Sequence, residues 1–288
     1  MLFLLCWVFL LSILGPQAPE NLGTKIVTRQ ILGPAGLSER TLYIMADRRR
    51  MEFRQSVQRR SNDGSPETQN ELSSVFIIRC DLGQSFFLRP KTGEYSSSPY
   101  PPKPPTPEQA TQLAVEKSDS GEPAKPTLRI ETTTVDTGER KEMFGYVARH
   151  VITTRKQTPL DGSNSQPSKS VTDGWYIDLD HSISCDPKPS PGSKRNGILS
   201  SGATVGGKQM PIDRPEFVDI GARETGLPLK ETRTVPMSTY FPDATSRTDD
   251  AINESEVTVF ERAAVDPALF VVPFGYKQVE SSQRKLAQ

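Results

Sequence analysis

The chain has no excess of charge of either sign, since 35 Lys and Arg residues balance 35 Asp and Glu residues. A nucleic-acid-binding domain usually carries a clear basic excess, so we expect no nucleic-acid partner. Apolar residues are also scarce, at 34% of the sequence, while 25 prolines and 20 glycines predict many turns and long loops. We therefore expect an ordered core that is small for a chain of 288 residues.

The signatures of common catalytic sites are missing as well. The sequence contains no G-x-S-x-G, no P-loop and no G-x-G-x-x-G, and the glycines of 202–207 lack the strand–helix setting of a phosphate-binding loop. Only two histidines occur, His150 and His181. A metal could bind His181 with Asp178 and Asp180, but their spacing fits no standard motif. We expect no catalytic residue, no metal and no cofactor, and keep a metal-dependent hydrolase as a weaker alternative.

A single long apolar run, from Leu2 to Leu14, opens the sequence and is ended by Gly15 and Pro16. The run is shorter than the roughly 20 residues that a membrane-spanning helix needs, and it suits the core of a secretory signal peptide. We expect residues 1–18 to form an apolar helix that acts as a signal peptide or signal anchor, the alternative being a buried helix. The protein would then be periplasmic or extracellular, with membrane contact only through this segment if it stays uncleaved.

Cysteine is rare, with three residues in the whole chain. Loss of a signal peptide would remove Cys6 and leave Cys80 and Cys185. An even pair of cysteines in an exported chain can form a disulfide, so we predict that these two are bonded. The alternative is two unpaired thiols, because the sequence does not give the Cα separation that a disulfide requires.

Short stretches of alternating polar and apolar residues fill much of the remaining sequence and predict strands. They cover residues 24–32, 39–46, 50–57, 74–82, 85–90, 128–135, 139–144, 146–156, 174–179, 226–236, 255–262 and part of 266–279. Two loop excursions interrupt them, a Pro-rich one at 96–126 with a short helix predicted from Thr106 to Lys117, and a Gly/Ser-rich one at 186–209. The pattern predicts a single mainly β domain over 24–279, followed by a polar tail at 280–288. Its fold class is a large curved antiparallel sheet with one or two short helices and long loops.

A basic cluster surrounds the predicted turn between the second and third strands. It consists of Arg48, Arg49, Arg50, Arg54, Arg59 and Arg60. Such a cluster could meet anionic headgroups or an acidic partner. We interpret it as a solvated hairpin whose charge is offset by the nearby acids Asp47, Glu52 and Asp63.

Several separated segments resemble, in their order, the outer-membrane lipoprotein carrier superfamily, whose members are LolA/LolB-like. ERTLYIMADRRRMEFR (39–54) looks like its second hairpin and IIRCDLGQSFFLRPKTGEY (77–95) like the next one. TGERKEMFGYVARHVITT (137–154) is similar to a Gly-Tyr turn and basic strand in uncharacterised secreted relatives. GLPLKETRT and LFVVPFGYKQV are similar to their last strands. The resemblance implies a strongly curved half-barrel whose apolar concave face holds acyl chains.

We therefore expect an exported, non-enzymatic β-protein that binds a lipid, an acyl chain or a lipidated protein on the concave face of its sheet. The alternating apolar residues of the second to fifth strands are the candidate lining, with the inward face left open: Leu42, Ile44, Met51, Phe53, Ile77 and Phe87. The alternative is a structural or interaction module of the cell envelope, with a filled core and no small-molecule ligand.

Overall fold

A computed structural model describes residues 21–32, 36–60, 66–102, 125–163, 165–187, 204–205, 208–209, 213–240 and 246–280. Within these ranges most residues belong to β-strands, which confirms the mainly β class. The strands are β1 (Leu22–Leu32), β2 (Leu37–Met45), β3 (Arg48–Arg60), β4 (Pro66–Arg79), β5 (Gln84–Arg89), β6 (Glu94–Pro99), β7 (Leu128–Met143), β8 (Tyr146–Pro159), β9 (Ser168–Ile177), β10 (Thr204–Val205), β11 (Lys208–Gln209), β12 (Pro215–Ile220), β13 (Leu227–Tyr240), β14 (Ser246–Ala264) and β15 (Lys277–Gln278).

The described strands form one open 13-stranded sheet in the order β12-β7-β8-β9-β13-β14-β1-β2-β3-β4-β5-β6-β15, and β10 pairs separately with β11. The expectation of an antiparallel sheet is wrong at both edges, because β12 pairs parallel with β7 and β15 pairs parallel with β6. A tight hairpin can join only antiparallel neighbours. Both edge strands are reached by longer connections, so their direction is free and the sheet is mixed.

Hairpin turns explain the central part of this order. The β2–β3 turn consists of two residues, Ala46 with a positive φ of 48° and Asp47. The β7–β8 turn likewise has Phe144 and Gly145, with φ of 52° and 77°. The first turn has a positive φ at its first residue, and the second turn has positive φ at both residues. These conformations are typical of two-residue hairpin turns, whose twist matches that of the paired strands. The glycine of the second turn adopts this conformation without a Cβ clash.

The described residues contain two short 3₁₀ turns, η2 (Cys80–Leu82) and η3 (Pro267–Phe270), and no α-helix. The predicted helix from Thr106 to Lys117 and the apolar segment of residues 1–18 lie outside the described residues. The predicted loop excursions start or end in strands, since β6 takes in Ser96–Pro99 and β10 and β11 lie within 186–209.

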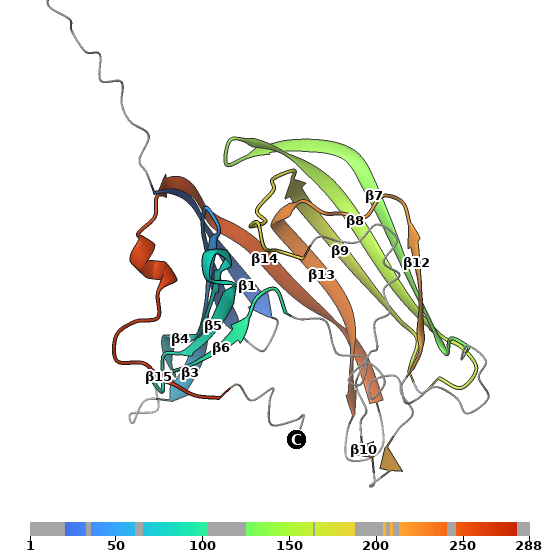
Figure 1. The fold of residues 1–288 in the computed structure, drawn as a ribbon. Helices are drawn as coiled ribbons and strands as arrows, with labels where there is room; N and C mark the ends of the chain where they lie inside the picture. Colours follow the sequence, from blue (N-terminus) through green and yellow to red (C-terminus); the bar gives the residue numbers. More distant parts are fainter. Residues whose placement is uncertain are drawn as a thin grey trace, which may run out of the picture.

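The sheet bends so that its two halves, β1–β6 and β7–β9 with β12 and β13, face one another (Figure 1). Aromatic contacts demonstrate the bend. Phe260 of β14 lies 5.3 Å from the ring of Tyr146 and 6.2 Å from that of Phe144, although β14 and β8 are three strands apart in the order. In a flat sheet three strand spacings would separate them by about 14 Å. These rings pack on the face whose core includes Ile26 and Leu42, so that face is concave.

The opposite, convex face of β3–β5 is closed by the C-terminal segment that contains η3 (Figure 1). Its core is a filled apolar cluster of buried side chains: Met45, Val75, Ile77, Leu88, Val265 and Phe270. Arg50 ties the segment down, because its Nη1 donates to the carbonyl of Leu269 at 2.7 Å and its Nε to Glu52 Oε1 at 2.7 Å. This face therefore offers no room for a ligand where the segment covers it.

A candidate ligand cavity on the concave face

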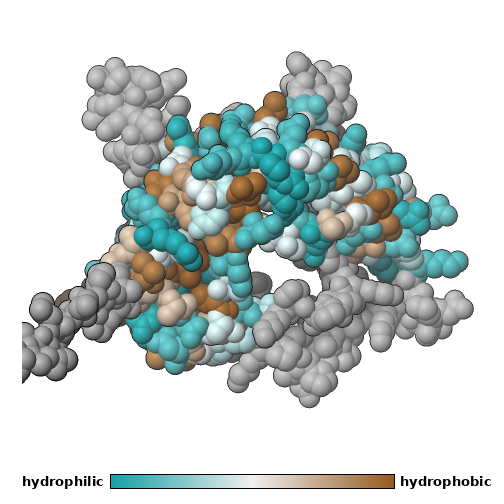
Figure 2. Space-filling model, turned by 90° about the horizontal axis from the view of Figure 1, so that it is seen from above, coloured by the Kyte–Doolittle hydropathy of each residue, from teal (hydrophilic) through white to brown (hydrophobic). Residues whose placement is uncertain are grey.

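The concave face contains a cavity of about 750 Å³. Its floor includes Leu42 of β2 and Met51 of β3, which lie directly opposite each other in the ladder. Its other walls come from residues 178–186, after β9, and residues 225–228, at the start of β13. Among the described residues, the lining consists of Arg40, Leu42, Arg49, Met51, Asp178, Leu179, Asp180, His181, Ser182, Asp186, Thr225, Gly226, Leu227 and Pro228. Seen from above, the molecule is hollowed near its centre, with hydrophilic and hydrophobic residues on the rim (Figure 2).

The structure divides the six apolar residues predicted to line a cavity. Leu42 and Met51 line it, and Ile44 packs against the same core cluster without reaching the cavity. Phe53 and Phe87 share this face by register but lie outside the cavity, and each is 37% exposed.

Ile77 is wrongly predicted as a lining residue. Successive strand residues point to opposite faces, and Ile77 pairs with Arg50 rather than with Met51. Its side chain is 0% exposed and belongs to the filled cluster beneath the C-terminal segment. The strand VFIIR has apolar residues on both faces, so its alternation did not identify the concave one.

Residues 178–187, called the strap below, cross from the end of β9 to β3 and β4. Cys185, predicted to pair with Cys80 from the cysteine count, is joined to it by a disulfide with a Cα–Cα distance of 5.5 Å. Beside it, Asp186 accepts from Arg49 Nη1 at 3.1 Å and from the Tyr100 hydroxyl at 2.9 Å. Arg49 also donates to the carbonyl of His181 at 3.2 Å. The strap is thus fixed to the first half of the sheet by one covalent and several polar contacts.

The charge of Asp186 is maintained by this setting. Burial acts to raise the pKa of its carboxyl, but hydrogen bonds from Arg49, from the Ile183 amide and from Tyr100 together outweigh burial and hold the pKa below its usual range. The pKa of Tyr100 is raised, first by burial and then by its hydrogen bond to the same carboxylate. Both groups therefore keep the protonation state that their hydrogen bond requires at neutral pH.

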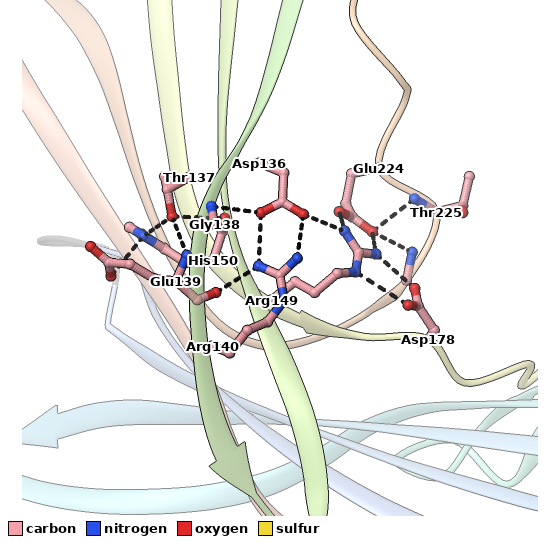
Figure 3. A network of polar contacts seen from close by, with 11 residues as sticks. Asp136, Thr137, Gly138, Glu139, Arg140, Arg149, His150, Asp178, Glu224 and Thr225 are labelled. Carbon is pink, nitrogen blue, oxygen red and sulfur yellow. Dashed lines mark hydrogen bonds and ion pairs between the residues drawn. The ribbon is translucent and has the colours of Figure 1, made fainter.

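Arg149 of β8 fixes the opposite end of the strap and the neighbouring wall (Figure 3). Its guanidinium donates to both carboxylate oxygens of Asp178, at 2.7 and 3.2 Å, and to both of Glu224, at 3.1 Å each. Glu224 in turn accepts from the amides of Thr225 and Gly226, which line the cavity. These hydrogen bonds from Arg149 are the main reason that the pKa of Asp178 is lowered. One arginine thus positions two walls of the cavity.

The candidate metal residues Asp178, Asp180 and His181 all lie on the strap and line the cavity, yet each has another contact. Asp178 binds Arg149, Asp180 accepts from the Ser182 amide at 2.9 Å, and His181 Nδ1 lies 3.2 Å from the Leu179 carbonyl. Across the part of the chain that the structure describes, no group of three or more His, Cys, Asp or Glu side chains could hold a metal ion.

The other histidine, His150 of β8, lies outside the cavity and stacks on Trp175, with ring centroids 4.8 Å apart and an angle of 18° between the ring planes. Its Nε2 is 2.8 Å from Asp173 Oδ1, and its Nδ1 is 3.1 Å from Thr137 Oγ1 and 3.3 Å from Glu139. A hydroxyl, an imidazole and a carboxylate in line occur in nucleophilic sites. Here the Thr137 hydroxyl also donates to the carbonyl of His150, and no residue of this set lines the cavity. These contacts join neighbouring strands β7, β8 and β9, so we interpret them as stabilising the sheet.

Sequence reasoning identified only part of the polar side of the cavity, through Asp178, Asp180 and His181 as possible metal ligands. Arg40, Arg49 and Asp186 were not singled out as lining residues. Arg40 could have been identified from its spacing, because it is two residues before Leu42 and residues two apart on a strand share a face. No local pattern pairs Arg49 with Asp186, which are 137 residues apart.

Comparison with protein-family models and with curated protein sequences gives no match to this chain. Within the described ranges, no helix combines the length and the apolar character needed to cross a membrane. The assignment of this cavity as a candidate binding site therefore depends on its geometry alone.

Proposed function

We propose that this chain is an exported, non-enzymatic β-protein that binds a lipid or another acyl chain in the cavity beneath the strap. One observation carries the proposal: a cavity of about 750 Å³ opens over the apolar pair Leu42 and Met51, with Leu179 and Leu227 on other walls. Ligand pockets typically measure about 300–1,000 Å³ and combine apolar walls with a few polar groups. Burial of an acyl chain against such walls is favourable by about 25 cal/mol for each Å² of apolar surface.

A carrier of the LolA/LolB-like kind is the family that we favour for this function. The resemblance of the hairpin segments implies a half-barrel, and a bent sheet with a cavity on its concave side supports that proposal. The mixed edges and the disulfide-held strap are features that the resemblance does not predict. The partner that such a carrier would bind is a lipidated protein.

Export belongs to the same proposal. The apolar run from Leu2 to Leu14 suits a signal sequence, and a disulfide between Cys80 and Cys185 suits an oxidising compartment. We place the protein in the periplasm or outside the cell.

A structural or interaction module of the cell envelope is the second candidate. The observation that favours it is the filled cluster beneath the C-terminal segment, which closes the convex face without a ligand. In that function the cavity would hold only water, and recognition would use the loops.

Ligand extraction separates the two functions. The full chain is expressed with its N-terminal segment, purified, extracted with organic solvent, and the extract is analysed by mass spectrometry. The delipidated protein is then titrated with a fluorescent fatty acid. We expect co-purified acyl compounds and saturable probe uptake; no extracted ligand together with no uptake would reject the lipid-binding function.

Two matched variants localise the binding. Met51→Glu places a carboxylate on the cavity floor and should weaken probe binding at least about tenfold, because an acyl chain packed against the carboxylate would remove its water. Phe87→Glu makes the same change on the same face outside the cavity and should leave binding unchanged. Leu179→Glu on the strap provides a second cavity variant if Met51→Glu does not fold. Equal effects of the cavity and control variants would place the probe elsewhere.

A further inference from the structure

The charged side chains that line the cavity differ in whether they have partners. Arg49 is paired with Asp186, and Asp178 is paired with Arg149. Asp180 accepts a hydrogen bond from a backbone amide. The side chain of Arg40 makes no hydrogen bond or ion pair with any other residue of the described ranges. It is half-buried on β2, where a guanidinium has lost part of its water.

Arg40 lies at one end of the apolar floor. It is two residues before Leu42 and therefore on the same face of β2. In the ladder Arg40 stands opposite Phe53 on β3, and Leu42 stands opposite Met51. On the β1 side its neighbour is Thr28, a buried residue with a hydroxyl group. The floor thus begins with a cation beside a hydroxyl and continues into the apolar pair.

The far end of the floor has a different charge balance. There Ile44 stands opposite Arg49, whose charge is already neutralised by Asp186 of the strap. On the strap, Asp178 is paired with Arg149, whereas Asp180 is an exposed carboxylate that accepts a hydrogen bond from a backbone amide. An anionic group is therefore repelled from the strap end and attracted to the Arg40 end, so the cavity has an electrostatic direction.

We propose that Arg40 binds the negatively charged head of a single-chain amphiphile whose apolar chain lies over Leu42 and Met51. The inference rests on the proposed lipid-binding function and names the class of ligand. A guanidinium has five N–H donors in a planar fork that matches a carboxylate or a phosphate. Charge-assisted hydrogen bonds of this kind are about twice as strong as neutral ones. A neutral or cationic head would leave the arginine without a partner.

The test is displacement of a bound fluorescent fatty acid by ligands with one chain length and different heads. Dodecanoate, dodecyl phosphate, dodecanol and dodecyltrimethylammonium are each titrated into the delipidated full-length protein. We expect the two anions to bind at least about tenfold more tightly than dodecanol, since a hydrogen bond to a charged group has this size. The stronger of the two anions then identifies a carboxylate or a phosphate head.

Variants assign the preference to Arg40. Arg40→Gln should remove about tenfold of anion affinity and leave dodecanol binding unchanged, and Arg40→Lys should restore part of it. Arg233→Gln is the matched control, because it removes the same charge from an exposed position on β13 outside the cavity. Its binding constants should equal those of the unchanged protein.

The outcomes separate the two proposals. If no ligand of the series binds, the lipid-binding function itself fails. If dodecanol binds as tightly as the anions, or Arg40→Gln weakens all four ligands equally, the cavity binds apolar chains and the role of Arg40 is refuted. Preference for dodecyltrimethylammonium would also overturn it and would point to the carboxylates of the strap.

Discussion

The disulfide between Cys80 and Cys185 gives the most quantitative prediction of this structure. It joins residues 105 positions apart in the sequence and fixes the strap over the cavity. Cross-linking a loop of this length removes chain entropy from the unfolded state equivalent to about 4–5 kcal/mol. Replacement of both cysteines by serine should therefore lower the free energy of unfolding by about this amount. That is a large share of the roughly 5–15 kcal/mol that stabilises a typical domain.

The strap also has contacts that survive this double substitution. Arg49 and Tyr100 still bind Asp186, and Arg149 still binds Asp178 at the other end. We therefore expect the folded variant to keep the strap docked and to retain fluorescent fatty-acid binding within a few-fold. Loss of stability with retained binding is the signature expected from an effect on the unfolded chain.

Equilibrium unfolding in urea measures the first quantity and probe titration the second. The oxidised protein, the double serine variant and the oxidised protein treated with a reducing agent are compared at one pH. The midpoint should fall in the last two samples. A change in unfolding free energy below about 1 kcal/mol would refute the entropic reasoning. Retained stability with lost probe binding would instead show that the bond acts only on the strap.

Three further changes test the cores and the polar anchors. Ile77→Ala should cost about 2–5 kcal/mol of stability, measured by urea unfolding, and leave probe affinity unchanged, because Ile77 lies in the filled convex cluster; altered affinity would contradict that placement. Arg149→Met should lower the free energy of unfolding by about 1–2 kcal/mol, mostly through Glu224, whose side chain is 11% exposed. Arg140→Met at a more exposed pair should lower it less, and equal losses would contradict this ranking. Acid should weaken the contacts of the strap, because the pKa of Asp186 in the folded protein lies below the ordinary 3.8. The stabilisation that the Asp186 carboxylate contributes is complete above about pH 4 and is lost as pH falls through the pKa of the folded state. Asp186→Asn should therefore show a shallower loss of unfolding free energy between about pH 4 and pH 2, and an unchanged slope would refute the linkage.

Local patterns in the sequence were sufficient to predict the strands that are joined by tight turns. The β2–β3 and β7–β8 hairpins follow from alternation on either side of Asp47 and of Gly145, where the turn geometry is set by two residues. β12 was not predicted, because PEFVDI is short and lies among polar residues. Its pairing with β7 depends on a return of the chain from 87 positions away, shown by the register of Pro215 with Leu128. Pairings of this kind are set by tertiary contacts rather than by local preference.

Alternation along the strands predicted only part of the cavity lining. Alternation identified Leu42 and Met51, since a strand presents every second residue to one face. It could not select a face in β4, where Ile77 and Ile78 are both buried on opposite sides. The strap residues Leu179 and Asp186 belong to a segment without periodicity, and their position depends on the distant partners Cys80 and Arg49.

The three consecutive arginines at the start of β3 show why a charge cluster is ambiguous in sequence. Among these three, our interpretation as a solvated hairpin holds only for Arg48, whose pair with Asp81 is partly exposed; farther along β3 it also holds for the partly exposed Arg54, which pairs with Glu52. Arg49 points to the concave side and holds the strap through Asp186, whereas Arg50 points to the convex side and binds Glu52 and the carbonyl of Leu269. Alternation along one strand thus sends neighbouring, chemically identical side chains to opposite faces. Strand β3 consequently anchors both covers of the sheet, the strap over the cavity and the C-terminal segment over the filled core. A substitution at either arginine would affect one cover alone, which the composition of the cluster does not reveal.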